Sequence, residues 1–381
     1  MPFKINAAFC IPLFLIFLAI GIFISIHKPI WNDENYSQAN TISHCTYPQI
    51  IFSGIQGEGN KSPLFYLQQK ILCDVFRYND QDEHSLIFKR IFLRIPTVGE
   101  ISLFLTLLFY FFTRRFNLWF GILSIFVALS SLMLWWYWAE ARPYGLWVVL
   151  TACQMFLFID IVENPPASRK YWILLGLVHI LLALTCVLSA IQITIVSTIL
   201  LFKNRHWKKF IFLLLIPLAL CLYYKPTGSA NDVIFTMTVD QLLRDNIARD
   251  RLYVLLFYPF LLLLYFIRTK FYSKIYSDHL IVKTFYFFLA VFSMILLTVV
   301  FLSYLREHSL NQGQYVVSRH IIFLLPVGII AVTYLTGIVW ENLKNTNWLR
   351  ILLILIILIL LFYRLQRIVA GIKQFFLGFH S

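Results

Sequence analysis

Residues 7–34 read AAFCIPLFLIFLAIGIFISIHKPIWNDE, an uncharged apolar run that ends a few positions before two adjacent acids, Asp33 and Glu34. A helix of about 20 apolar residues is long enough to cross the hydrocarbon core of a bilayer. The run has the charge layout of a signal peptide, but it lacks a small-residue cleavage site, so we predict a retained membrane helix. Asp33 and Glu34 then lie where the chain leaves the membrane.

The rest of the 381-residue chain has the same apolar character. Hydrophobic residues make up 60% of it, charged residues only 13%, and its mean hydropathy is +0.76. A water-soluble globule cannot bury so much apolar side chain. The sequence contains about eleven apolar runs near spanning length, which use most of the chain. We therefore predict an all-α, polytopic transmembrane protein of about 11 spans, without a large soluble domain.

The formal net charge of +14 is distributed in short blocks between the apolar runs. These blocks are Arg114–Arg115, Arg169–Lys170, Lys203–Lys209, Arg268–Lys274 and Lys344–Arg350. They fall in alternate loops, which the positive-inside rule assigns to the cytoplasm. Most acids fall in the other loops, so we expect those loops to face outward, with the amino terminus inside and the carboxyl terminus outside. The pattern indicates topology rather than binding to nucleic acid.

The first outward loop, residues 27–90, is the longest polar stretch of the chain. Loops of this length in compact proteins are usually functional or disordered. Within it, residues 63–78 carry apolar side chains at helical spacing, which predicts an amphipathic helix on the membrane surface. A helix packed on protein gives the same pattern. The tail, residues 364–381, carries a similar apolar stripe, which predicts a separate interfacial helix. Cys45 and Cys73 share the first outward loop, and the sequence leaves open whether they pair.

Charged and polar side chains recur at or near the outward borders of the predicted spans. The candidate catalytic residues are Asp33 and Glu34, and the candidate ligands of substrate or phosphate are Lys61, Arg94, Glu140, Arg142, Tyr144, Arg319 and His320. Arginine binds phosphate oxygens through a planar fork, and a carboxylate can accept the proton of an attacking hydroxyl or amine. Since charge near a membrane is costly and usually functional, this combination predicts group transfer with a lipid phosphate as the leaving group.

Each of these residues also has a plainer interpretation. Asp33 can be a solvated loop acid, and Arg94 can be an interfacial anchor whose head group reaches water. Glu140 and Arg142 can form a local salt bridge that closes a turn. Arg319 can mark only a helix edge, and Lys61 can be a solvated loop lysine.

Cofactor motifs are absent from the sequence. It contains no dinucleotide-binding fingerprint, no glycine-rich phosphate loop and no Cys/His spacing typical of a metal site. No cofactor is therefore required by the sequence. A divalent cation at the acids of the first outward loop, Asp33 and Glu58, is permitted but not demanded.

Four segments resemble a known family, the GT-C membrane glycosyltransferases, and most closely its protein O-mannosyltransferase and aminoarabinose-transferase branch. The segments are Trp31-Asn32-Asp33-Glu34, Ser62-Pro63-Leu64-Phe65-Tyr66-Leu67, Leu93-Arg94-Ile95-Pro96-Thr97-Val98-Gly99 and Ala141-Arg142-Pro143-Tyr144. The likeness covers the first helix to about residue 162 and is thin afterwards, apart from Ser318-Arg319-His320 followed by Pro326. It suggests a single GT-C-like unit over residues 1–381, with a catalytic module in 1–162 and a more variable helical module in 163–381.

The resemblance implies an inverting transferase that takes a sugar from a polyprenyl-phosphate carrier on the outer side of a bacterial inner membrane. By motif, Asp33 aligns with the proposed catalytic base, while Arg94, Arg142 and Arg319 align with arginines that hold the carrier phosphate. The acceptor would be a lipid, a glycan or a protein. The chain departs from relatives at Lys61-Ser62, where they often carry His-Pro, and it lacks the carboxy-terminal soluble domain of some members.

Two rival functions remain at this point. A transporter or flippase of a lipid-linked sugar would also need arginines at the border, and it predicts broken helices or charges near mid-membrane. A scaffold without activity would be insensitive to Asp33→Ala. The sequence does not identify the sugar, the acceptor or the length of the carrier.

Overall fold

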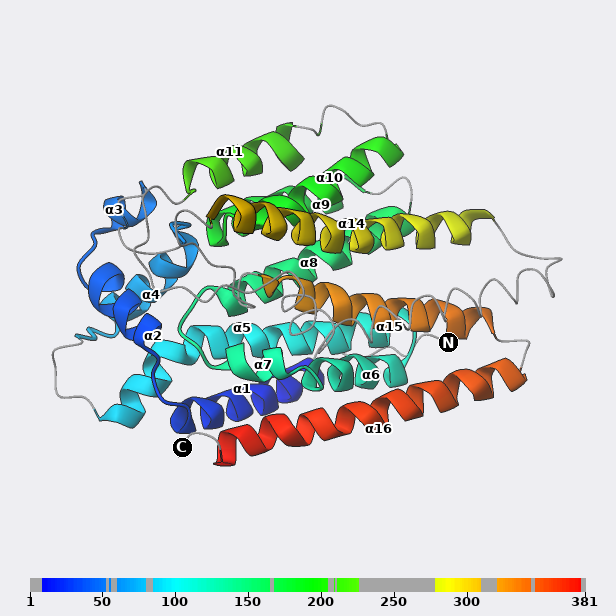
Figure 1. The fold of residues 1–381 in the computed structure, drawn as a ribbon, viewed down its shortest axis with the longest axis horizontal. Coiled ribbons are helices and arrows are strands. Elements are labelled where there is room, and N and C mark those ends of the chain that lie inside the picture. The colour runs from blue at the N-terminus through cyan, green and yellow to red at the C-terminus, as the bar shows by residue number, and fades with distance from the viewer. Residues whose placement is uncertain are drawn as a thin grey trace.

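A computed structural model describes residues 9–52, 55, 60–79, 85–164, 168–204, 209, 211–225, 278–309, 321–343 and 347–377. Every regular element in these ranges is a helix, which confirms the all-α prediction for this part of the chain (Figure 1). In chain order the elements are α1 (Cys10–His27), α2 (Asn32–Tyr36), the π-helix η2 (Ser37–Ile42), α3 (Tyr47–Ile51), α4 (Leu64–Val75), α5 (Leu86–Arg115), α6 (Leu118–Leu129), α7 (Leu132–Trp138), α8 (Tyr144–Glu163), α9 (Arg169–Thr185), α10 (Ser189–Asn204), the π-helix η4 (Ile211–Leu215), α11 (Ile216–Tyr223), α14 (Asp278–Ser309), α15 (Leu324–Asn342) and α16 (Asn347–Leu377).

The apolar helices identify a membrane protein. Within the described ranges, 6 helices are long and apolar enough to cross a bilayer, or up to 7 if the bent pair α6 and α7 counts as one span. Two shorter apolar helices, Ser189–Lys203 and Ile211–Tyr223, correspond to further predicted spans. A further apolar run that we count among the predicted spans, residues 252–267, lies outside the described residues. The membrane character is thus established, whereas the full number of spans stays a prediction.

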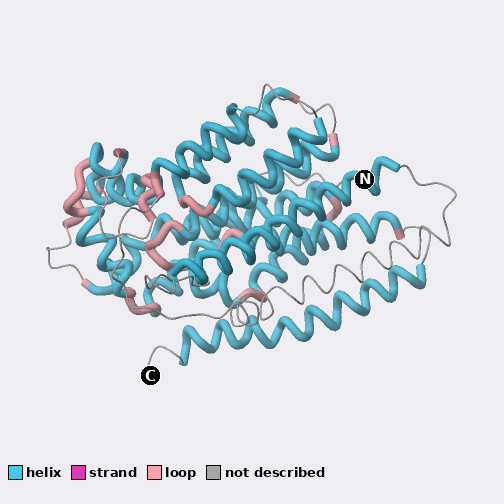
Figure 2. Tube along the Cα trace, turned by 45° about the horizontal axis from the view of Figure 1, so that its top comes forward, coloured by secondary structure: helices cyan, strands magenta, loops and turns pink. Residues whose placement is uncertain are grey.

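The long helices run side by side, and the short helices α2, α3 and α4 gather at one end of them (Figures 1 and 2). We call this end, where α1 finishes and α5 begins, the α2–α4 end. The carboxyl end of α16 lies at the same end (Figure 1). The opposite end, where α5 finishes, is called the Arg115 end.

Helix α5 is central to the bundle because it packs against α1, α6 and α8. Ser85 caps its start by accepting a hydrogen bond from the Phe88 amide (3.2 Å), which pairs one of the donors that a helix start leaves open. Its middle turns bury Phe104, Leu108 and Phe112 completely. At 30 residues α5 is about 45 Å long, so about three turns extend beyond a hydrocarbon core of about 30 Å.

One of the apolar runs, residues 118–136, suggests a single span by its length, but it is not one helix. It is divided into α6 and α7, which meet at a bend of 76° around Ser130 and Ser131. The Ser130 hydroxyl donates to the Val127 carbonyl (2.7 Å), and Arg364 of α16 donates to the same hydroxyl oxygen (2.5 Å). A serine side chain that hydrogen-bonds to nearby backbone can interrupt a helix. Two serines within a long apolar run were too weak a signal to predict the bend from the sequence.

The predicted amphipathic helix at residues 63–78 is confirmed as α4. Its buried side chains include Phe65, Tyr66 and Cys73, which belong to a small cluster with Phe92 of α5. This face therefore packs on protein rather than on a membrane surface. Cys73 and Cys45 are both free thiols.

The tail also differs from its prediction as a separate interfacial helix. Up to Leu377 it continues α16 without a break.

Candidate functional site

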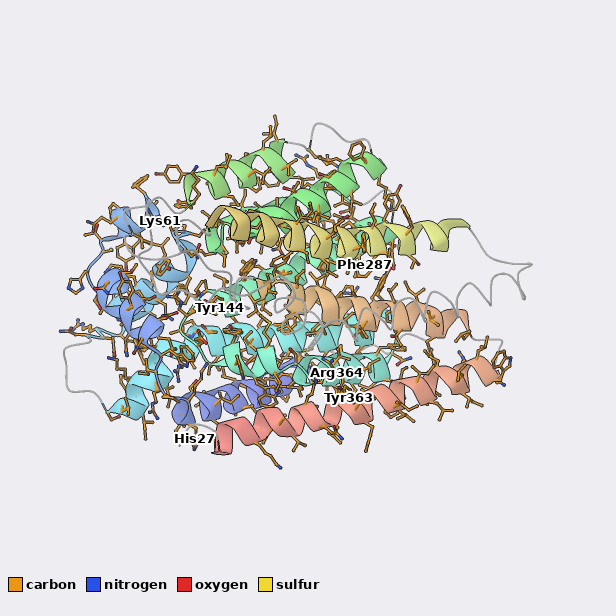
Figure 3. All side chains as sticks on the ribbon, viewed as in Figure 1. His27, Lys61, Tyr144, Phe287, Tyr363 and Arg364 are labelled. Carbon is orange, nitrogen blue, oxygen red and sulfur yellow. The ribbon has the colours of Figure 1, made fainter. Side chains whose placement is uncertain are left out.

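Four segments meet at the α2–α4 end of the bundle. They are the end of α1, the short helix α2, the second and third turns of α5, and the turn between α7 and α8. Arg94 lies about 12 Å along α5 from its start, which places it near a membrane border. Tyr144 begins α8 at this end, and His27 ends α1 there (Figure 3).

A buried ion pair between Arg94 and Glu34 lies at the centre of this region. Arg94 donates from Nε to Glu34 Oε1 (2.8 Å) and from Nη2 to Glu34 Oε2 (2.6 Å). The two side chains are 0% and 1% exposed, so the pair is shielded from water. A two-point bond of this kind fixes both side chains in orientation as well as in position.

The remaining donors of Arg94 bind the end of α1. Nη1 donates to the carbonyls of Ser25 (3.2 Å) and Lys28 (2.6 Å), and Nη2 donates to the carbonyl of Pro29 (2.6 Å). A guanidinium group has five N–H donors, and these bonds together with the two to Glu34 use all of them. Arg94 therefore ties α1 and α2 to α5, and it has no donor left for a ligand in this structure.

Glu34 extends the same network to the α7–α8 turn. Its Oε1 accepts the amide of Ala141 (2.7 Å), and its Oε2 accepts the amide of Trp31 (2.9 Å). Burial by itself raises the pKa of Glu34, but the hydrogen bonds and charge of Arg94, with these two amides, hold the pKa below its ordinary value. The Glu34 carboxylate is thus ionised and fully engaged within the protein.

A second buried pair lies beside the first. Lys28 Nζ is 3.3 Å from Glu140 Oε2 and donates to the Trp136 carbonyl (2.5 Å). Burial lowers the pKa of Lys28 and raises the pKa of Glu140, although the attraction between the two groups opposes both changes. This pair fastens the end of α1 to the α7–α8 turn.

Asp33 has a different environment from its neighbour Glu34. It is half-buried, and it lies four residues before Ser37, so the two side chains share one face of the helical turn. Arg142 Nη1 donates to the Ser37 hydroxyl (2.5 Å) and approaches the Asp33 carbonyl (3.5 Å). The guanidinium group of Arg142 therefore lies against the face of this segment that carries Asp33.

The structure brings six of the predicted site residues into one region. Asp33, Glu34, Arg94, Glu140 and Arg142 are linked by the bonds given above, and Tyr144 follows Arg142 at the start of α8. The Tyr144 ring packs edge-on against Tyr137, with ring centroids 4.9 Å apart.

Lys61 lies in a segment that is held at the end of α9. Its neighbours donate to carbonyls there, Asn60 to Thr185 (2.8 Å) and Ser62 to Ala183 (3.2 Å), and Lys61 itself is half-buried (Figure 3). Glu58, Arg319 and His320 lie outside the described residues. Among the residues that are described, no three His, Cys, Asp or Glu side chains are grouped as metal ligands would be.

The sequence interpretation missed three participants. Lys28 and Ser37 were not singled out, because a lysine or serine just outside a span is common. Glu100 of α5 is buried next to Gly145 of α8, and a glutamate within an apolar run was a signal that deserved a prediction.

Comparisons with protein families, with curated proteins and with solved structures found no match to this chain.

Proposed function

We propose that the α2–α4 end carries the active site of a glycosyltransferase, which moves a sugar from a polyprenyl-phosphate donor to a lipid, glycan or protein acceptor. The observation that supports this most is the contrast between Asp33 and Glu34. One of two adjacent carboxylates is locked in a buried ion pair, while the other remains half-buried beside a guanidinium group. Neighbouring carboxylates in unlike environments commonly have unlike roles.

In the proposed reaction Asp33 is the general base. It accepts the proton of an acceptor hydroxyl or amine as that group attacks the anomeric carbon of the donor sugar. The bond from the anomeric carbon to the phosphate oxygen breaks, and the phosphate leaves with the electron pair. A single displacement of this kind inverts the anomeric configuration. General bases typically contribute about 10²- to 10⁴-fold to a rate.

Arg142 is the proposed phosphate ligand. Its guanidinium group lies on the Asp33 face of the α2 segment, so a phosphate bound there would lie next to the base. Arg94 was expected to share this role by motif, but its donors are all used within the protein. We therefore assign Arg94 and Glu34 to positioning α2, and with it Asp33.

We also propose on which side of the membrane the reaction takes place. The basic residues at the Arg115 end, including Arg114, Arg115, Arg169 and Lys170, support a cytoplasmic location for that end. The active site would then face the periplasm of a bacterial inner membrane, in a fold of GT-C type, where lipid-linked sugars are within reach. A divalent cation stays optional, and Arg319 and His320 remain proposed ligands from outside the described residues.

Sugar transfer tests this proposal. Membranes carrying the wild type, Asp33→Asn or Arg142→Ala are given a panel of radiolabelled polyprenyl-phosphate sugars and cell-envelope acceptors. Asp74→Asn is the matched control, because Asp74 is an exposed carboxylate of the same predicted loop. We expect the wild type and the control to use one donor, Asp33→Asn to lose about 10²- to 10⁴-fold, and Arg142→Ala about 10²- to 10³-fold.

The main alternative is a transporter of the same lipid-linked sugar. If the wild type moves a labelled donor across a vesicle bilayer without cleaving it, the transferase proposal fails and transport takes its place. If Asp33→Asn transfers sugar as fast as the wild type, Asp33 is not the base.

A further inference from the structure

Glu100 is a carboxylate at this end of the bundle that the proposed reaction does not use. Neither of its oxygens has a hydrogen-bond partner in the described residues, and both are closed to solvent. Glu34 and Glu140, by contrast, have Arg94 and Lys28 as partners. A buried polar group without a partner is costly, by several kcal/mol for an ionised one, and it is seldom kept without a function.

The position of Glu100 connects it to the candidate site. A Cβ atom on Gly145 would lie 2.8 Å from Glu100 Oε2 and 2.8 Å from Thr97 Cγ2, so the carboxylate lies against the first turn of α8. The Thr97 hydroxyl in turn donates to the Arg142 carbonyl (3.4 Å). Arg142 and Glu100 therefore adjoin the same short segment, residues 142–145.

Two further polar groups lie beside the carboxylate. They are the side chain of Gln68 from α4 and the backbone amide of Leu146 in α8, and neither makes a hydrogen bond of ordinary geometry with Glu100. The positive end of the α8 dipole also favours a negative charge at this point. Glu100 as a whole keeps 8% of its surface exposed, so water reaches the residue though not its oxygens.

We propose that Glu100, with Gln68 beside it, binds hydroxyl groups of the sugar that is transferred. This inference rests on the proposed function, because it takes the donor sugar as the ligand. A sugar whose phosphate meets Arg142 would have its ring next to segment 142–145, and it would reach the Glu100 oxygens when that segment moves aside. Carboxylate oxygens accept hydrogen bonds, and sugar hydroxyls can donate them. In this account Glu100 selects the donor sugar by binding its hydroxyls. The proton of the acceptor goes to Asp33, not to Glu100.

The first test measures binding without depending on transfer. Full-length Glu100→Cys protein in liposomes is treated with a small thiol-reactive thiosulfonate, with and without each polyprenyl-phosphate sugar of the panel, and the labelling of the wild-type cysteines is subtracted. We expect labelling of the introduced thiol and at least about a tenfold slowing by one donor. If no donor slows the labelling, or if the thiol is never labelled, the proposal is overturned.

The second test uses kinetics. Glu100→Gln keeps the size of the side chain. If the role of Glu100 were purely structural, glutamine would fill it as well as glutamate does. We expect it to raise KM for the donor about tenfold or more, since an amide NH2 replaces one of the oxygens that accept the hydroxyls, and to weaken discrimination against a donor that lacks one hydroxyl. Glu341→Gln, at an exposed carboxylate of α15, is the control and should match the wild type. Equal KM and equal discrimination in Glu100→Gln would overturn the proposal.

The two tests separate this inference from the proposed function. If a donor protects the Glu100→Cys thiol but is never transferred by the wild type, Glu100 binds the sugar and the transferase proposal fails. If transfer occurs and depends on Asp33 while Glu100→Gln behaves as the wild type, the transferase proposal stands and this inference fails.

Discussion

Removing the guanidinium group of Arg94 should destabilise the protein strongly. The substitution Arg94→Met keeps much of the aliphatic volume but leaves Glu34 as an unpaired charge whose side chain is 1% exposed. It also removes the donors of three carbonyls, those of Ser25, Lys28 and Pro29. Breaking one partner of a buried ion pair typically costs about 3 to 5 kcal/mol. We therefore expect the free energy of unfolding to fall by at least about 3 kcal/mol.

A double-mutant cycle isolates the pair from its surroundings. In Arg94→Met with Glu34→Gln, no unpaired buried charge remains, so the double variant should lose less than the sum of the single variants, by about 1 to 3 kcal/mol. The assay is unfolding of detergent-purified protein by titration with sodium dodecyl sulfate, followed through tryptophan fluorescence. Arg90→Met is the matched control, because Arg90 lies one turn earlier on α5 and donates to a single carbonyl, that of Ile26 (2.8 Å).

Two results would refute this reasoning. One is an Arg94→Met protein within about 1 kcal/mol of the wild type, since a buried pair should be worth more. The other is strict additivity in the cycle, which would mean that Arg94 and Glu34 do not depend on each other.

Three other parts of the protein can be tested by substitution: the Glu34 carboxylate, the contact at Gly145 and the Arg115 ion pairs. The folded-state pKa of Glu34 lies below its ordinary value of 4.5, so its contribution to stability is complete above pH 4.5 and is lost as the pH falls through the lowered pKa. The free energy of unfolding should therefore fall less steeply with decreasing pH in Glu34→Gln than in the wild type. An equal slope in the two proteins would contradict this. Gly145→Ala places a methyl group 2.8 Å from Glu100 and should lower the free energy of unfolding by about 1 to 3 kcal/mol in the same assay. The control Gly99→Ala, whose methyl group would meet nothing within 4 Å, should not lower it. An equal loss of stability in the two variants would exclude the close contact at Gly145 as the cause. At the Arg115 end, Arg115 forms ion pairs with Asp160 (3.2 Å) and Glu163, and the three side chains are 16–28% exposed. Arg115→Met should lower the free energy of unfolding by about 1 to 3 kcal/mol and leave the rate of sugar transfer per folded molecule unchanged. A slower transfer would show that this network acts on the site.

The helices were largely predictable from the sequence because each apolar run carries its own signal. The charge-free run at residues 7–26 became α1, with boundaries within three residues. The apolar run at 91–112 became part of α5, which begins five residues earlier, at Leu86. The bend at Ser130 was not predictable in this way. It lies at two serines, and Ser130 accepts a hydrogen bond from Arg364, which is 234 residues away along the chain.

The site was predictable as a list of residues but not as a set of roles. Border position singled out Glu34, Arg94 and Arg142 without saying which carboxylate pairs with which arginine. Glu34 and Arg94 are 60 residues apart, and only the packing of α1 on α5 brings them together. Glu100 was overlooked because it lies within an apolar run that was interpreted as a span and nothing more.

The most direct test of the account is the rate of sugar transfer by Asp33→Asn compared with that of the wild type, at equal amounts of folded protein. The account predicts a folded Asp33→Asn protein that still binds donor but transfers sugar about 10²- to 10⁴-fold more slowly. Glu34→Gln, in contrast, should lower the free energy of unfolding and should slow transfer per folded molecule less than Asp33→Asn does. Transfer by Asp33→Asn at the wild-type rate would contradict the assignment of Asp33 as the base.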